Sequence, residues 1–128
     1  MTSYLLVFLG AGLGGALRHG VTIGCARVCG TSFPWGTLAV NVVGSFAMGA
    51  MAAWLALKAG EGWSEPLRLF LTTGILGGFT TFSAFSLDAV VLWERGQTGL
   101  AGMYVAASVL LSIAGLLGGL AAVRALAA

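Results

Sequence analysis

Charged residues are scarce in this chain. Of its 128 residues, 6 are Lys or Arg and 4 are Asp or Glu, so 8% are charged, whereas 59% are hydrophobic. So few polar side chains do not coat a water-facing domain, but a lipid bilayer accepts an apolar exterior and requires only that the backbone be hydrogen-bonded internally. The composition excludes an ordinary soluble domain and predicts an integral membrane protein. A formal net charge of only +2 also argues against a nucleic-acid partner.

Groups that perform catalysis or bind metals are equally few. The chain has one His, and its first carboxylate is Glu61. The sequence therefore offers no pairing of a nucleophile with a base, and we expect no enzyme. Cys25 and Cys29 lie near His19 in the sequence. Three candidate ligands lack the fourth of a closed zinc site, and a buried Cys is commonly a small apolar filler. We therefore expect no zinc centre there.

Long apolar runs are abundant instead. Four of them cover roughly residues 4–24, 36–57, 68–93 and 100–123, and each reaches the ~20 residues with which a helix crosses the hydrocarbon core. Polar, Gly and Pro residues separate them at 27–34, 58–66 and 94–99. The sequence predicts one all-α domain of four transmembrane helices over residues 1–128. We expect no cleaved signal peptide, because no Lys or Arg precedes the first run, which continues past Arg18.

Positive charges are divided almost evenly between the two faces of the predicted bundle. An excess of Lys and Arg on one side normally fixes the orientation of a membrane protein. We interpret the even division as insertion in both orientations and assembly as an antiparallel pair. The two sets are Lys58, Arg68 and Arg124 on one face, and Arg27 and Arg95, with Arg18 nearby, on the other.

Glycines recur at a spacing of four residues, which lets membrane helices approach closely. Any Gly-rich membrane helix also produces some such pairs by chance. Together they favour a compact bundle or an oligomer. The pairs are Gly10 and Gly14, Gly20 and Gly24, Gly74 and Gly78, and Gly115 and Gly119.

Polar residues recur at every fourth position in the second and fourth spans, which places each set on one helix face. Such uncharged donors suit an anion that must lose its water without being trapped by a salt bridge. They equally suit hydrogen bonds between packed membrane helices, and the spacing alone does not choose. The residues are Thr37, Asn41 and Ser45 in the second span, and Tyr104, Ser108 and Ser112 in the fourth.

The third span has the least secure helix. Residues 74–86, GILGGFTTFSAFS, combine paired Gly with clustered Thr and Ser, all of which weaken a helix. We predict an interruption near mid-membrane, whose freed carbonyls are natural ligands for a small hard cation. If helix resumes, Phe82 and Phe85 share a face, and their positive ring edges can help to solvate an anion. Packing or lipid contact is the alternative role of these rings.

Three blocks make the chain resemble the small bacterial fluoride channels of the Fluc (CrcB) family over essentially its whole length. The first block is Gly10, Gly14 and Arg18, and the second is residues 35–45, WGTLAVNVVGS. The third and most specific is residues 74–86. The resemblance implies a passive, fluoride-selective channel of the bacterial inner membrane that exports cytoplasmic fluoride. It also implies an antiparallel homodimer with two pores and a structural sodium ion on the two-fold axis.

The resemblance further assigns roles to residues at matching positions. Asn41 is expected to be a pore-lining amide donor. Phe82 and Phe85 are expected to be the aromatic pair whose ring edges meet the permeating ion. Gly77 and Thr80 are expected to supply the backbone carbonyls that bind sodium in each subunit.

Other matched residues receive supporting roles. The hydroxyls of the fourth span, on Tyr104, Ser108 and Ser112, are expected to line part of the pore, with Ser83 as a further candidate. Arg18 is expected near a pore vestibule. Thr37 belongs to a matched block without an expected ion contact.

Two other functions fit a four-span chain of this length. A small proton-coupled multidrug exporter needs a membrane carboxylate, typically in the first span, whereas Asp88 in the third is the only acid within a predicted span here. A non-transporting assembly subunit would use the polar residues as packing contacts. Fluoride efflux from loaded liposomes distinguishes the three functions.

Overall fold

Four helical spans make up the chain, and the computed structural model describes residues 1–58, 61–62 and 64–127. Three spans are single helices: α1 (Thr2–Cys29), α2 (Trp35–Leu57) and α6 (Thr98–Ala127). The third span comprises α3 (Ser64–Arg68), the π-helix η1 (Leu69–Leu76), α4 (Gly77–Phe79) and α5 (Phe82–Glu94). All four are long and apolar enough to cross a bilayer, which confirms the predicted spans of a multi-pass membrane protein.

The helices extend beyond the predicted apolar runs at both ends. The first begins at Thr2 and ends at Cys29, and the fourth runs on to Ala127, because the flanking polar and small residues continue the helix past the apolar stretch. The predicted separator at 58–66 contains residues 59, 60 and 63, which lie outside the described residues.

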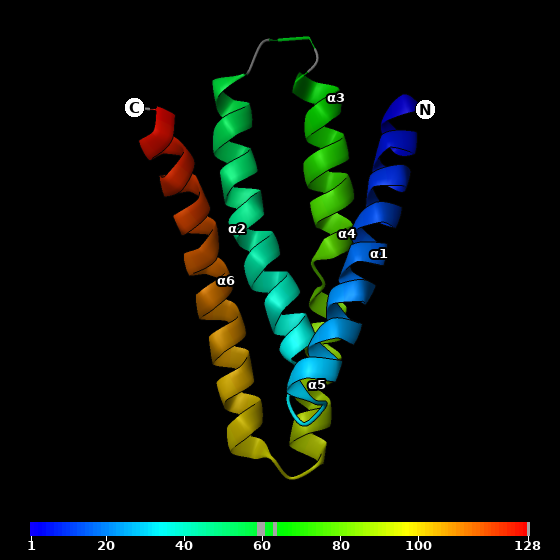
Figure 1. Cartoon of the computed structure of the whole chain (residues 1–128), viewed down its shortest axis with the longest axis vertical. Helices are drawn as coiled ribbons and strands as arrows, with labels where there is room; N and C mark the ends of the chain where they lie inside the picture. Colours follow the sequence, from blue (N-terminus) through cyan, green and yellow to red (C-terminus); the bar gives the residue numbers. More distant parts are fainter. Residues whose placement is uncertain (59–60, 63, 128) are drawn as a thin grey trace.

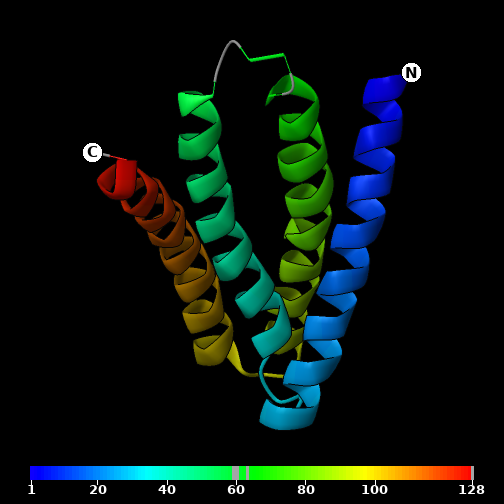
Figure 2. The ribbon, with the colours of Figure 1, turned by 45° about the horizontal axis from the view of Figure 1, so that its top comes forward.

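The spans form two packed pairs (Figure 1). One pair is α2 against α6, and the other is α1 against η1 and α4, while α5 packs on α6. Both chain ends lie at one end of the bundle, and the α1–α2 and α5–α6 turns lie at the other, where the pairs converge (Figure 2). The separate halves of the third span therefore contact different neighbours.

Glycine contacts explain why helices approach so closely within each pair. A Cβ on Gly10 of α1 would stand 2.6 Å from Phe70 O and 2.8 Å from the Cα of Gly74. A Cβ on Gly119 of α6 would overlap the carbonyl of Phe46 in α2. These are contacts that only glycine permits.

Not every predicted glycine pair packs helices within the chain. Gly14 and Gly78 also lie against backbone of the neighbouring span, and Gly115 would bring a Cβ within 3.2 Å of a carbonyl of α2. Gly20 and Gly24 have nothing within 4 Å. Within the described single chain this pair packs no helices together, and its role in an oligomer stays a prediction.

The buried core gathers where α5, α6 and the start of α2 meet. Tyr104 is fully buried there with Phe85, Leu92 and Ala101. Phe33, Leu38, Ala89 and Leu100 pack around this cluster. The aromatic and aliphatic contacts hold α5 in place directly after the point where the third span changes direction.

Candidate functional site

The third span is interrupted at Thr80 and Thr81. The backbone is extended at both residues, with φ −84° and ψ 158° at Thr80 and φ −153° and ψ 123° at Thr81. β-branched Thr favours extended backbone. The Thr81 hydroxyl also caps α5, because it accepts the N–H of Ala84 at 3.2 Å. The interruption predicted within residues 74–86 is thus found between α4 and α5.

Asn41 of α2 binds the interrupted backbone through both ends of its carboxamide. Its Nδ2 donates to the carbonyl of Thr81 at 2.9 Å, and its Oδ1 accepts the N–H of Thr81 at 2.8 Å. A side-chain amide has two N–H groups and only one is used in this pair. Asn41 therefore secures the interruption and keeps one donor for the space beside it.

Two backbone carbonyls lose their usual helical donors at the interruption. In an α-helix the carbonyl of Gly77 would accept from Thr81 N–H and that of Thr80 from Ala84 N–H. Here Thr81 N–H binds Asn41, and Ala84 N–H binds the Thr81 hydroxyl. The interruption therefore frees the carbonyls of the two predicted sodium ligands.

Neutral oxygens are suitable ligands for sodium at this place. Unwound carbonyls coordinate Na⁺ within membranes. Among the described residues no three His, Cys, Asp or Glu side chains gather to form a competing metal site, and Cys25, Cys29 and His19 form no such group. The backbone carbonyl oxygens of Gly77 and Thr80 therefore fit a monovalent hard cation.

Arg18 of α1 reaches the same interruption. Its Nε donates to the carbonyl of Gly78 at 3.1 Å, and its side chain is half-buried. In a continuous helix this carbonyl would accept the N–H of Phe82. The guanidinium thus satisfies a third backbone group, and a cation inside a span finds a polar partner, as such residues require.

A pocket of about 320 Å³ lies beside the interruption, between α2, α5 and α6. It brings together five of the residues predicted to line an anion path, and none of the described residues that line it is charged. The lining residues are Asn41, Ser45, Thr80, Thr81, Phe82, Phe85, Ser108, Val109, Ser112 and Ile113.

The two predicted aromatic residues differ in burial. The ring centroids of Phe82 and Phe85 are 5.5 Å apart with the planes tilted by 55°. Phe85 is 9% exposed, whereas Phe82 is 78% exposed. The pair shares one wall of the pocket, and Phe82 stands at its open side.

The polar face of α6 continues the pocket into the core. The Ser108 hydroxyl is buried and makes no hydrogen bond among the described residues. One turn away, the Tyr104 hydroxyl lies near Ser108 and Thr37 and donates to Asp88 Oδ2 at 3.2 Å. Thr37, Tyr104 and Ser108 are all buried, so the two predicted polar faces do meet between α2 and α6.

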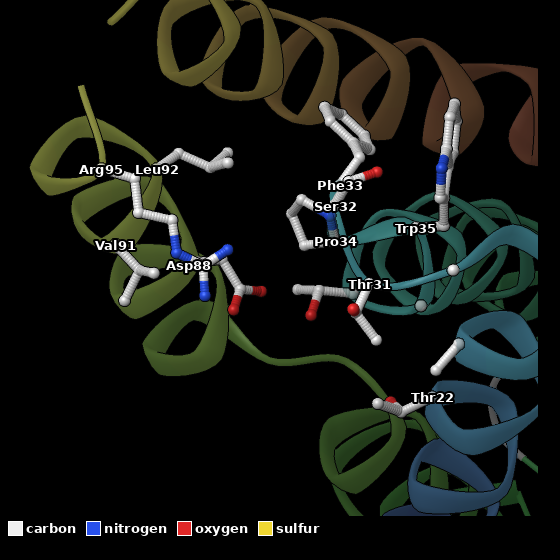
Figure 3. A pocket seen from close by; sticks show the side chains of 14 residues that line it. Thr22, Thr31, Ser32, Phe33, Pro34, Trp35, Asp88, Val91, Leu92 and Arg95 are labelled. Carbon is white, nitrogen blue, oxygen red and sulfur yellow. The ribbon is translucent and has the colours of Figure 1, made fainter. Parts of the chain in front are cut away.

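A second pocket, of about 210 Å³, lies at the converging end of the bundle (Figure 3). Asp88 of α5 and Arg95, the residue directly after α5, face it opposite Thr31 and Phe33 of the α1–α2 turn. Thr37 also lines it. The two polar faces therefore lead from the first pocket toward this second one.

Sequence reasoning missed the aromatic residues of the α1–α2 turn. The Phe33 ring meets the Tyr104 ring edge-on, with centroids 5.4 Å apart and an angle of 89°. Tyr104 in turn lies 5.3 Å from Phe85, and Phe33 lies 4.6 Å from Trp35. The sequence signal was present, because Phe33 and Trp35 flank Pro34 where the predicted separator at 27–34 meets the second span.

Two predicted pore residues do not line the first pocket: Tyr104, which is buried beside it with Thr37 and Ser108, and Ser83. The Ser83 hydroxyl lies 3.4 Å from the Thr81 hydroxyl, and Ser83 is exposed. The remaining predicted residues lie at the interruption, on the wall of the first pocket, or among the buried hydroxyls of Thr37, Tyr104 and Ser108.

Known proteins similar to this chain match it over nearly its whole length. Residues 5–120, which include every residue of the first pocket, match the family described as CrcB-like protein, Camphor Resistance (CrcB). The chain is 54% identical over 122 residues to Fluoride-specific ion channel FluC 2 of Nitrobacter hamburgensis, covering 95% of this chain and 97% of that protein. It is 56% identical over 124 residues to Fluoride-specific ion channel FluC of Rhodopseudomonas palustris, covering 97% and 98%. It is also 56% identical over 128 residues to the protein of that name from Granulibacter bethesdensis, covering 98% of each.

Proposed function

We propose that this chain, which belongs to the CrcB family, forms a passive ion channel selective for fluoride. The similar proteins are named fluoride-specific ion channels, and the similarity covers almost their entire length. The observation that carries the proposal is the pocket beside the interruption, where amide, hydroxyl and aromatic groups gather and none of the described lining residues is charged.

The chemistry of the pocket suits a small, strongly hydrated anion. A conducting pore must replace the water of the ion with donors, yet hold it weakly enough for it to leave. Asn41 has an unused amide N–H, and the buried Ser108 hydroxyl lacks a partner among the described residues. The edges of the Phe82 and Phe85 rings add weakly positive C–H groups. A full positive charge in their place would bind the ion too tightly for rapid exit.

An antiparallel homodimer is the assembly that the chain supports best. Lys and Arg are divided almost evenly between the two ends of the bundle, as a protein that inserts in both orientations requires. Phe82 and Gly77 are exposed on the single chain although they belong to the functional region. A second copy covering that face would complete the walls, and two-fold symmetry then gives two pores.

A structural sodium ion fits the same assembly. The carbonyls of Gly77 and Thr80 from each copy would hold it where the two interruptions meet. Held there, the ion would supply a fixed positive charge and would join the subunits. The chain's own residues make the site possible, because Asn41 and the Thr81 hydroxyl take the N–H groups that would otherwise satisfy these carbonyls.

Export across the bacterial inner membrane is the cellular role. Hydrogen fluoride enters the cell as a neutral molecule and ionises in the less acidic cytoplasm. The fluoride ion then leaves down its gradient through the channel, so that no energy-coupling group is needed. Asp88, the acid that a proton-coupled exporter would use, instead accepts a hydrogen bond from Tyr104.

Matched Phe variants test whether the pocket conducts. Liposomes containing the purified protein are loaded with potassium fluoride, and valinomycin is added so that potassium movement balances the charge. A fluoride electrode then records release. Phe82→Ile should slow release at least about tenfold, because the ring edge is lost, whereas Phe8→Ile should not. Phe8 is similarly exposed but lies on α1 outside the pocket. Equal release from both variants would contradict the role of the ring.

A further inference from the structure

We infer that Asn41 is a positioning residue for the sodium-binding carbonyls, in addition to lining the anion pocket. The inference rests on the proposed function for the identity of the two ions. One side chain builds both sites, so that the cation and anion sites are linked through the Asn41–Thr81 hydrogen bonds.

Asn41 competes with a backbone carbonyl for one N–H group. Thr81 N–H has two possible acceptors in this fold, the carbonyl of Gly77 in a continuous helix and Oδ1 of Asn41 in the observed structure. An unpaired N–H is costly within a membrane. Without the Asn41 acceptor, the N–H is driven back to Gly77, which removes that carbonyl from the cation site.

A pair of hydrogen bonds joins Asn41 to the backbone of Thr81. Asn41 both donates to and accepts from the same residue, Thr81, at 2.9 and 2.8 Å. Residues of neighbouring β-strands are joined by the same exchange of one donor and one acceptor, and here it holds the Thr81 backbone extended. The extended backbone in turn places the Thr81 hydroxyl where it accepts Ala84 N–H, and this second bond frees the carbonyl of Thr80. Both proposed ligands therefore depend on one carboxamide.

Close packing of α2 brings the Asn41 carboxamide to the interruption. Gly44, three residues after Asn41, has no Cβ, and one placed there would overlap the Thr80 methyl group and stand 3.2 Å from the Phe79 ring. The missing side chain allows α2 to lie directly against the interruption. Asn41 thus projects from a rigid, closely packed helix, which is the support that a precise site needs.

Two substitutions separate positioning from pore lining. Asn41→Leu keeps a branched side chain but has no acceptor, so sodium affinity should fall at least about tenfold. Asn41→Asp keeps an acceptor for Thr81 N–H and adds a negative charge, so sodium affinity should stay unchanged or rise. Both variants should lose fluoride flux, Leu because a donor is gone and Asp because it repels the anion. A residue that only lines the pore would leave sodium affinity unchanged in both.

The experiment measures sodium affinity and fluoride flux in parallel on the full chain. Sodium replaces choline at constant ionic strength, and the rise in thermal unfolding temperature of the detergent-solubilised protein gives the affinity. Ser45→Ala is the matched control, because Ser45 lines the same pocket one turn away, and its sodium affinity should equal that of the wild type. If Asn41→Leu does not fold, Asn41→Ser serves, since its shorter side chain does not span the same distance to Thr81.

The measured sodium affinities decide whether Asn41 positions the carbonyls or only lines the pore. Weakened sodium binding in the Leu or Ser variant together with retained binding in Asn41→Asp supports the inference. Equal sodium affinity in wild type and the Leu or Ser variant overturns it. Loss of binding in Asn41→Asp, or a wild-type protein whose unfolding ignores sodium, also overturns it. If the sodium affinities follow the expected pattern but the wild-type protein releases no fluoride, the proposed function is refuted and the positioning role stands.

Discussion

Replacing Thr81 with Val tests whether the Thr81 hydroxyl holds the end of the interrupted helix. Val keeps the β-branched shape that favours extended backbone, so the substitution removes mainly the acceptor of Ala84 N–H. Loss of an N-cap acceptor costs about 0.5–2 kcal/mol, and the Ala84 N–H that loses it is part-buried. We expect the free energy of unfolding to fall by about 1–2 kcal/mol.

The assay is equilibrium unfolding in mixed micelles titrated with a denaturing detergent. Thr22→Val is the matched control, because the Thr22 hydroxyl is exposed and donates at 2.9 Å to a carbonyl within its own helix. Such back-bonding adds little to helix stability, so we expect a change below about 0.5 kcal/mol there. Thr81→Ser should retain most of the stability, because it keeps an acceptor. Equal losses in Thr81→Val and Thr22→Val would refute the capping argument.

Two further substitutions test the packing around the pocket. Gly44→Ala should destabilise the protein and abolish most fluoride flux, because the new methyl overlaps that of Thr80, whereas Gly12→Ala, with nothing within 4 Å, should leave both properties nearly unchanged. Unfolding and efflux assays on both variants check this, and a tolerated Gly44→Ala would contradict it. Tyr104→Phe should lower the free energy of unfolding by about 1 kcal/mol, since it removes the donor to Asp88. A Tyr104→Phe/Asp88→Leu double variant should lose less than the sum of the single changes, and simple additivity would mean that the bond contributes nothing.

The spans and the polar faces could be predicted because they depend on local pattern. Four apolar runs required four helices, and the spacing of Asn41 and Ser45 placed both side chains on one face of α2. The matching spacing of Ser108 and Ser112 did the same on α6. The structure adds that these two faces meet at one pocket, which follows from the glycine contacts that join α2 to α6.

The details of the interruption could not be predicted from local pattern. Clustered Gly, Thr and Ser showed that residues 74–86 form a weak helix, but the break falls at Thr80 and Thr81 because a side chain 40 positions away binds Thr81. The π-helix of Leu69–Leu76 likewise had no sequence signal. It lies where the third span packs backbone against backbone on Gly10 of α1, a tertiary contact that periodicity does not encode.

Fluoride release from liposomes that contain the wild-type chain is the deciding measurement of whether the chain conducts fluoride selectively. Vesicles loaded with equal concentrations of potassium fluoride and potassium chloride receive valinomycin, and ion-selective electrodes follow both anions. We expect rapid loss of fluoride with chloride retained, because the neutral donors of the pocket replace the hydration shell of the smaller ion. Vesicles that retain fluoride as firmly as protein-free vesicles, or that release both anions alike, would contradict it.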